Sequence, residues 1–148
     1  MPILPRKGIL AIAAVVDIAL HDGDHPVSAK ALATRHGLPP RHLEPVLQAL
    51  VRCGILKGIR GPRGGYELAR DRRRVTVNDI LQAAATVEDG DEPQSGSELV
   101  KKVVLPAVAA AEREFGVALS RISVEDLARD AQALGEQQPE ARAAEARR

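Results

Sequence analysis

Residues 38–69 read L-P-P-R-H-L-E-P-V-L-Q-A-L-V-R-C-G-I-L-K-G-I-R-G-P-R-G-G-Y-E-L-A, and the first half of this stretch has the pattern of an amphipathic helix. Pro40 suits the first position of a helix, where the missing N–H has no partner to lose. Apolar residues then recur at helical spacing and should face inward, namely Leu43, Val46, Leu47 and Leu50. We therefore expect a helix from Pro40 to about Cys53, ended by Gly54 and only mildly distorted by Pro45.

The second half of the same stretch predicts a β-hairpin. Two short runs of β-capable residues, 55–60 and 66–69, flank the turn G-P-R-G-G at 61–65. Between Lys57 and Arg74 there are seven basic residues and two acidic ones. A slim, glycine-rich turn that carries arginines is suited to a narrow, electronegative minor groove.

The residues before this stretch predict two further helices. The apolar stretch 8–20 indicates a buried helix over about residues 7–21. Ser28 is a good N-cap for a second, shorter helix, which Gly37 should end. The second and third helices, joined by a tight turn and followed by a basic hairpin, predict a winged helix-turn-helix.

The residues after the hairpin are expected to be helical as well. Thr76 should cap a short helix over 77–84, and Ser123 a last helix to about Leu134. Between them a long helix is expected over 98–119, kinked by Pro106. Two adjacent apolar stripes run along it, and we expect one to cover the helix-turn-helix and the other to meet a second copy of the chain. The stripe assigned to dimerisation consists of Val100, Val104, Val108, Ala111, Phe115 and Leu119; beside it lie Leu99, Val103, Ala107 and Ala110.

The fold class is therefore mainly α with a small β-hairpin wing, plus a long C-terminal dimerisation helix. The expected divisions are a DNA-binding domain at 1–85, an acidic loop at 86–97, a dimerisation and C-terminal helical segment at 98–135, and a disordered tail at 136–148. The composition agrees with closely packed helices, since only one Tyr, one Phe and no Trp occur among 148 residues.

The charge of the chain is unevenly distributed. Residues 1–85 carry 13 Lys and Arg against 7 Asp and Glu, whereas residues 86–148 carry 8 against 13. A basic N-terminal half suggests a polyanionic partner, although a charge run such as 72–74 can also be a simple solvated face.

Other classes of protein are disfavoured. The sequence has no apolar run long enough to span a membrane, and one cysteine fits a reducing cytoplasm, so we expect a cytoplasmic protein. Its four histidines are scattered, which predicts no metal site, and no catalytic arrangement or phosphate-binding motif is evident. We expect no enzymatic activity and no cofactor.

Polar residues of the third helix and the basic residues of the hairpin are the candidate contacts to double-stranded DNA. Arg41 can bond guanine or a phosphate, Gln48 can bond adenine, and Glu44 can accept from cytosine. Arginines after the hairpin would suit phosphates, which position a protein without specifying sequence. The candidates are Arg41, His42, Glu44, Gln48, Arg60, Arg63, Arg72, Arg73 and Arg74.

The strings H-L-E-P-V-L-Q-A-L-V-R-C-G-I-L-K (42–57), R-G-P-R-G-G-Y-E-L-A-R (60–70) and V-T-V-N-D-I (75–80) closely resemble the IscR/NsrR-like regulators of the Rrf-two family. The resemblance extends over about residues 5–134. It implies a two-fold dimer on a roughly palindromic operator, with DNA contacts from the recognition helix and the wing arginines, here Arg41, Glu44, Gln48, Arg60 and Arg63.

The chain departs from many members of that family in its cysteines. Those members hold an iron–sulfur cluster through three cysteines in the loop before the dimerisation helix, and here residues 88–97 contain none. Such clusters usually need four ligands, so we expect a cluster-free branch. Cys53, near Arg52 and Lys57, is either an oxidant-sensitive thiol or, as we expect, a small buried residue packed against the next strand.

These observations predict a sequence-specific, homodimeric DNA-binding transcription regulator, acting as a repressor because occupying promoter DNA needs no further chemistry. The alternative is a winged-helix interaction module that docks on a metabolic enzyme. The sequence leaves open the target genes and any small-molecule effector.

Overall fold

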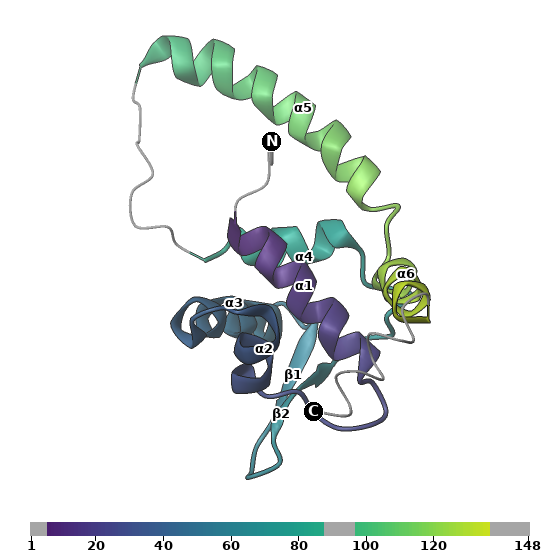
Figure 1. The fold of residues 1–148 in the computed structure, drawn as a ribbon. Helices are drawn as coiled ribbons and strands as arrows, with labels where there is room; N and C mark the ends of the chain where they lie inside the picture. Colours follow the sequence, from purple (N-terminus) through teal and green to yellow (C-terminus); the bar gives the residue numbers. More distant parts are fainter. Residues whose placement is uncertain (1–5, 88–96, 137–148) are drawn as a thin grey trace.

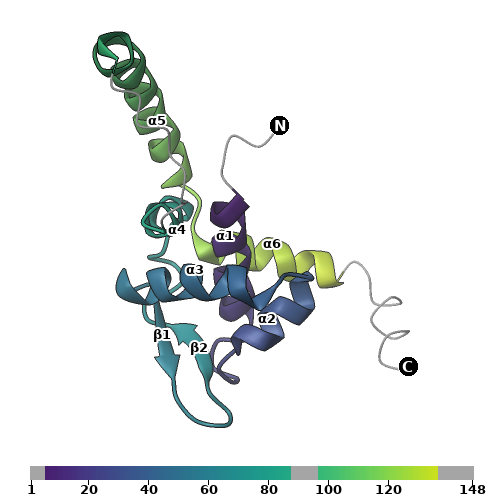
Figure 2. The same cartoon turned by 90° about the vertical axis from the view of Figure 1, so that its left-hand side faces the viewer.

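The computed structural model describes residues 6–87 and 97–136. The tail expected at 137–148, nearly all of the acidic loop and the first five residues lie outside these ranges. The described chain forms a compact body from which one long helix projects (Figures 1 and 2). The elements are, in chain order, α1 (Arg6–Leu20), α2 (Ala29–His36), α3 (Pro40–Arg52), β1 (Leu56–Ile59), β2 (Gly65–Leu68), α4 (Val77–Ala84), the π-helical turn η1 (Val100–Val104), α5 (Leu105–Leu119) and α6 (Val124–Glu136).

Local capping interactions set the helix ends as the sequence predicts. The hydroxyl of Ser28 accepts from the amide of Ala31, and Gly37 ends α2 in the left-handed conformation at φ 62°. Thr76 opens α4 with a capping box closed by Asp79. These caps confirm the predicted starts of α2 and α4 and the predicted end of α2.

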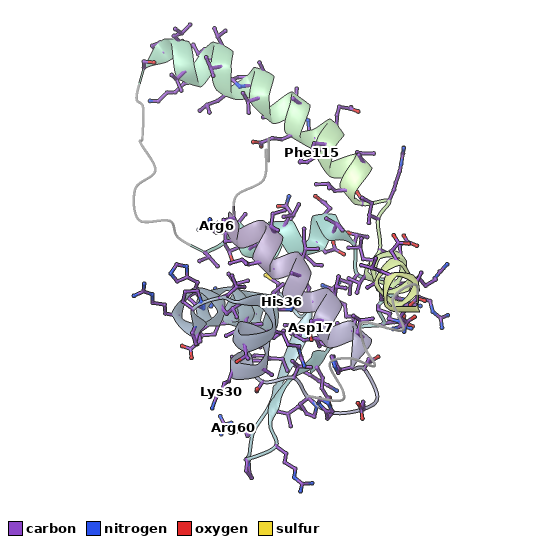
Figure 3. The ribbon with its side chains drawn as sticks, in the orientation of Figure 1. Arg6, Asp17, Lys30, His36, Arg60 and Phe115 are labelled. Carbon is purple, nitrogen blue, oxygen red and sulfur yellow. The ribbon has the colours of Figure 1, made fainter. Side chains whose placement is uncertain are left out.

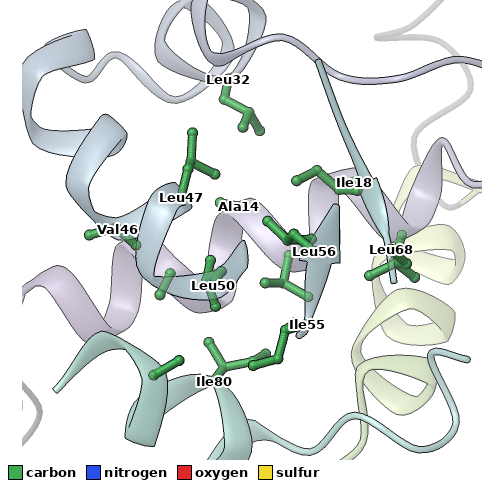
Figure 4. Close-up of a cluster of buried hydrophobic side chains, with 14 of the residues drawn as sticks. Ala14, Ile18, Leu32, Val46, Leu47, Leu50, Ile55, Leu56, Leu68 and Ile80 are labelled. Carbon is green, nitrogen blue, oxygen red and sulfur yellow. The ribbon is translucent and has the colours of Figure 1, made fainter. Parts of the chain in front are cut away.

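One apolar core lies where α1, α3, the hairpin and α4 meet (Figure 4). The four predicted inward residues of α3 are all buried, with Ile18 of α1 and Ile80 of α4 packed in the same cluster. Fully burying side chains of this size contributes about 1.5–3 kcal/mol each. Helix α1, expected from the sequence to be a buried helix, buries about half of its residues, while Ile9 and Leu20 remain 46% and 38% exposed.

The C-terminal segment does not behave as one unit. Val124 of α6 is buried in the core of the body, and α6 packs against α1. In contrast, α5 stands away from the body in both views (Figures 1 and 2). Within the segment predicted at 98–135, α6 thus packs with the body, and α5 projects from it.

The expectation that one face of the long helix covers the helix-turn-helix is wrong. No residue from Val100 to Leu119, a range that the structure describes in full, is buried. Leu99 is 65% and Val103 59% exposed.

A π-helical turn precedes Pro106, where the sequence predicts a kink. The amide of Leu105 donates to the carbonyl of Val100, five residues earlier. Proline lacks an N–H, and its ring clashes with the carbonyl four residues before it, which is that of Lys102. Widening the preceding turn relieves this clash, so the distortion takes the form of η1.

Candidate nucleic-acid interface

Helix α3 presents a polar face because its apolar side is committed to the core. Pro40 occupies the first turn, and five residues of the helix are buried. The candidate contacts all lie on the remaining surface and are exposed: Arg41, His42, Glu44 and Gln48. Three of them lie in the first half of the helix, which is the part that a recognition helix directs at base edges.

Pro45 lies inside α3 without breaking it. Its missing N–H would have bonded the carbonyl of Arg41, which is exposed to solvent at the start of the helix. The mild distortion expected from the sequence therefore leaves one continuous helix.

The hairpin β1–β2 forms the predicted wing. Its strands are antiparallel, with Leu56 opposite Leu68 and Ile59 opposite Gly65. The turn between them is narrow, since the amide of Gly64 donates to the carbonyl of Gly61 at 2.9 Å. A Cβ atom on Gly64 would lie 2.1 Å from the carbonyl oxygen of Ile59, so no other residue fits there unchanged.

Both wing arginines are exposed, as expected for DNA contacts. Arg60 and Arg63 flank or occupy the turn and have no ion pair among the described residues. Lys57, by contrast, faces Glu67 across the strands at 3.6 Å. The positive charge at the end of the wing therefore comes from the two arginines.

Backbone hydrogen bonds join the wing to the helix-turn-helix. Val27, directly before the N-cap of α2, pairs with Tyr66 of β2 in an antiparallel bridge. A hollow of about 380 Å³ lies beside this bridge, between α2 and the turn of the wing. It is lined in part by Ser28, Arg35 and Arg63. The wing is thus tied to the helix-turn-helix at the start of α2.

The arginines that follow the wing are used differently from one another. Arg72 is ion-paired with Glu125 of α6, and its guanidinium also donates to the carbonyl of Ala19 at 3.4 Å. Arg73 is exposed and lies 3.9 Å from Asp71, while Arg74 is exposed. The structure therefore places Arg72 in the contact between α1 and α6, away from the surface formed by α3 and the wing.

Lys30 is a basic residue that the sequence reasoning did not single out. It is exposed in the first turn of α2, and Figure 3 shows it on the same side of the body as Arg60. Its position in the sequence, two residues after the Ser28 cap, could have identified it. This position lies in the first turn of the helix that directly precedes the recognition helix in the motif.

The position of Cys53 corrects the sequence expectation. We expected it to be buried against the next strand, but it is exposed at the C-terminal cap of α3. The buried residues here are instead Ile55 and Leu56, which follow in the chain and pack in the core. The carbonyl of Cys53 accepts from the guanidinium of Arg70 at 3.4 Å.

The donor set does not fit an iron–sulfur cluster. The chain has one cysteine, and cluster irons need several thiolates. Within residues 6–87 and 97–136, no three His, Cys, Asp or Glu side chains gather in a way that could hold a metal ion. In the same ranges, no helix has the length and apolarity needed to cross a membrane.

A family model described as "Rrf2: Iron-dependent Transcriptional regulator" matches residues 4–130. The chain is 36% identical over 80 residues to the HTH-type transcriptional regulator IscR of Xenorhabdus nematophila, a match that covers 54% of this chain and 49% of that protein. It is 35% identical over 80 residues to IscR of Photobacterium profundum, covering 54% and 46%. The matched region thus spans about half the length of these curated relatives.

Solved structures give the same assignment over more of the chain. IscR of T. potens superposes with a TM-score of 0.67 at 30% identity, covering 86% of this chain and 87% of that one. CymR, the global cysteine regulator of B. subtilis, superposes with a TM-score of 0.64 at 27% identity, covering 86% and 97%. The relatives are regulators, which confirms the expectation that this protein is not an enzyme. By sequence and by fold, the chain belongs to the Rrf2 family of winged-helix transcriptional regulators.

Proposed function

We propose that the protein is a sequence-specific DNA-binding transcription regulator that acts as a homodimer on a roughly palindromic operator. The observation that carries this proposal is that the exposed face of α3 and the wing belong to one packed body, in which α3 contacts β1 and the wing is bridged to the start of α2 through Val27 and Tyr66. A recognition helix fits the major groove, and a slim arginine-tipped wing fits the adjacent minor groove.

Within this surface the residues have different roles. Arg41, His42, Glu44 and Gln48 of α3 contact base edges or the neighbouring backbone, and Arg60 and Arg63 enter the minor groove. Arg73 and Arg74, being exposed, contact phosphates. Arg72 is left out of the proposed surface because its guanidinium is held by Glu125.

The homodimer is supported by the exposure of α5. Its apolar stripes, uncovered in the single chain, have the character of an interface, because large contiguous apolar patches are rare on monomers. A two-fold pairing of α5 with its copy would cover them and set two recognition helices on two operator half-sites.

We further propose that the regulator is a repressor and works without an iron–sulfur cluster. Repression needs only occupancy of promoter DNA. The wing and the recognition helix suffice for such occupancy, so no further surface of the protein is required. The single, exposed Cys53 cannot supply the ligand set of a cluster.

The test is selection of a binding site from a random-sequence duplex library, followed by affinity measurements at several salt concentrations. The logarithm of the association constant should fall linearly with the logarithm of the salt concentration, with a slope of roughly 0.9 per neutralised phosphate. The variant Arg60→Ala/Arg63→Ala should bind the selected duplex more weakly. A matched control is Arg121→Ala/Arg129→Ala, which removes two exposed arginines from the turn after α5 and from α6.

Two results would contradict the proposal. One is failure of the parent protein to enrich any duplex, which would favour the interaction-module alternative. The other is an Arg60→Ala/Arg63→Ala variant that binds the selected duplex as tightly as the parent protein does.

A further inference from the structure

Asp17 of α1 is the one buried charged side chain among the residues that the structure describes, with 7% of its surface exposed. A buried carboxylate is costly unless it is paired and hydrogen-bonded. Asp17 lies on the side of α1 that faces α2, where it meets three basic side chains. Its burial therefore depends on contacts that tie the two helices together.

The contacts of Asp17 are short and come mainly from the last turn of α2. Arg35 binds the carboxylate with two nitrogens, Nε to Oδ2 at 3.0 Å and Nη2 to Oδ1 at 2.7 Å. His36 lies with Nε2 2.8 Å from Oδ2, and His21 of the turn after α1 lies with Nδ1 3.4 Å from Oδ1. Figure 3 shows Asp17 and His36 between the two helices.

Helix α2 packs against α3 and is tied to the wing at its start, but it buries few side chains of its own that could fix the position of its last turn. It is eight residues long and buries only Leu32 and Ala33. Isolated helices of this length are not stable in water, so their position is set by what they pack against. Two-nitrogen binding of an arginine to a carboxylate has a defined geometry, which apolar contact lacks. The contact with Asp17 therefore fixes the position of the last turn of α2 against α1.

The end of α2 determines the position of the proposed DNA-binding elements on both sides. Gly37, in the left-handed conformation, turns the chain directly from His36 towards Pro39, the N-cap of α3. On the other side, the Arg35 side chain lines the hollow against Pro62 and Arg63 of the wing. One carboxylate thus holds two residues that adjoin the recognition helix and the wing.

We infer that Asp17 is a positioning residue for DNA recognition, which acts through Arg35 and His36 to set the recognition helix and the wing relative to each other. This inference rests on the proposed function. A second consequence follows from charge. By neutralising Arg35, Asp17 keeps a guanidinium near the DNA-facing surface from binding phosphates of any sequence, which would raise non-specific affinity.

The test compares Asp17→Asn with the parent protein on two probes, the duplex selected by the parent and a scrambled duplex of the same length. The ratio of the two affinities should fall about tenfold, a size typical of losing one positioned polar contact. Asp22→Asn is the control, because it removes one exposed carboxylate just after the same helix. It should keep the parental ratio. An Asp17→Asn ratio equal to that of Asp22→Asn would overturn the inference.

A second variant separates the effect of Asp17 on stability from its effect on DNA recognition. Asp17→Leu/Arg35→Met replaces the buried ion pair by apolar side chains of similar size, a change that is often neutral or stabilising. If Asp17 only stabilised the fold, this variant would discriminate between the two duplexes as the parent does. We expect it to remain folded by circular dichroism and still to lose discrimination.

The partner His36 provides a conservative rescue. A carboxylate only accepts hydrogen bonds, so Nε2 of His36 donates to Asp17. His36→Gln keeps a donor and should retain most of the discrimination, whereas His36→Leu should lose it; equal ratios in the two variants would contradict the inference. If the parent protein itself selects no duplex, the proposed function fails. If the parent discriminates between the duplexes and Asp17→Asn discriminates equally well, only the inference about Asp17 fails.

Discussion

Val27 and Tyr66 exchange two backbone hydrogen bonds, with the amide of Tyr66 donating to the carbonyl of Val27 at 2.8 Å and the amide of Val27 donating to the carbonyl of Tyr66 at 3.0 Å. This pairing brings the two backbones so close that a Cβ atom on the preceding residue, Gly65, would lie 2.5 Å from the carbonyl carbon and oxygen of Val27. The wing can therefore dock on the start of α2 only if residue 65 has no side chain.

Gly65→Ala should weaken both the fold and DNA binding. The added methyl group must push β2 away from Val27, at a cost of about 1–3 kcal/mol in the free energy of unfolding, which is typical of overpacking. Gly58→Ala is the matched control, since a Cβ atom there meets nothing within 4 Å. Urea denaturation and affinity for the selected duplex would check this, and equal effects of the two substitutions would show that the Val27–Tyr66 pairing does not constrain the wing.

Val108→Asp should convert the proposed dimer into monomers. Val108 is 47% exposed in the single chain and lies in the apolar stripe of α5. A carboxylate buried in the paired helices would lack a partner, and its desolvation costs several kcal/mol. Sedimentation equilibrium would measure the mass. Ser120→Asp adds the same charge at the C-terminal cap of α5, on another side of the helix, and should leave the dimer intact. A parent protein that sediments as a monomer would contradict the proposed pairing.

The start of α6 should contribute to the pH dependence of stability. The Ser123 amide donates to Oδ2 of Asp126 at 3.0 Å, and Ser123 hydrogen bonds, backbone first and then side chain, hold the pKa of this carboxyl below its ordinary value of 3.8. Because the pKa is lower in the folded state, the stabilisation is complete above the unfolded value and is lost as the pH falls through the folded value.

Asp126→Asn should therefore destabilise the protein at about pH 6, and the destabilisation should be smaller at about pH 3, below the ordinary value of 3.8. Urea denaturation of the parent and the variant at both pH values measures the difference. Asp130→Asn, an exposed carboxylate one turn further along α6, serves for comparison. A destabilisation by Asp126→Asn that grew as the pH fell would have the wrong sign for this explanation.

Cys53 should react with a maleimide reagent in the folded protein. Its side chain is exposed at the end of α3, and it is the one cysteine of the chain. We expect one label per chain without denaturant, at a rate close to that of the urea-unfolded protein, and none in Cys53→Ser. Protection of the thiol in the native state by a factor of about a thousand, as expected for a residue exposed only by global unfolding, would restore the buried interpretation.

Much of the fold is predictable because its signals are local. The starts of α2 and α4 depend on side-chain caps that bond amides three residues away. The hairpin follows from a Gly/Pro turn between two short β-capable runs, and the inward face of α3 from the helical period. The candidate DNA-contacting residues on α3 and the wing are the polar residues that this apolar pattern leaves on the surface.

The failures have a common physical origin in packing between distant segments. Four basic residues of similar appearance, Arg70 and the consecutive Arg72 to Arg74, differ in their contacts, and only packing against α6 commits Arg72 to Glu125. Cys53 is exposed because Ile55 and Leu56 cover the core instead. The two stripes of α5 indicate burial, but periodicity does not say whether the covering surface belongs to the same chain.

The sequence by itself determined the order of the elements, where most of them begin and end, and the family of the protein, because each of these depends on residues that are neighbours along the chain. Only the tertiary structure decided which charges are free to meet DNA and which hold the body together. Asp17 meets Arg35 and His36 across 18 and 19 residues of chain. No local pattern specifies such a contact, since it exists only once α1 and α2 have packed on the common core.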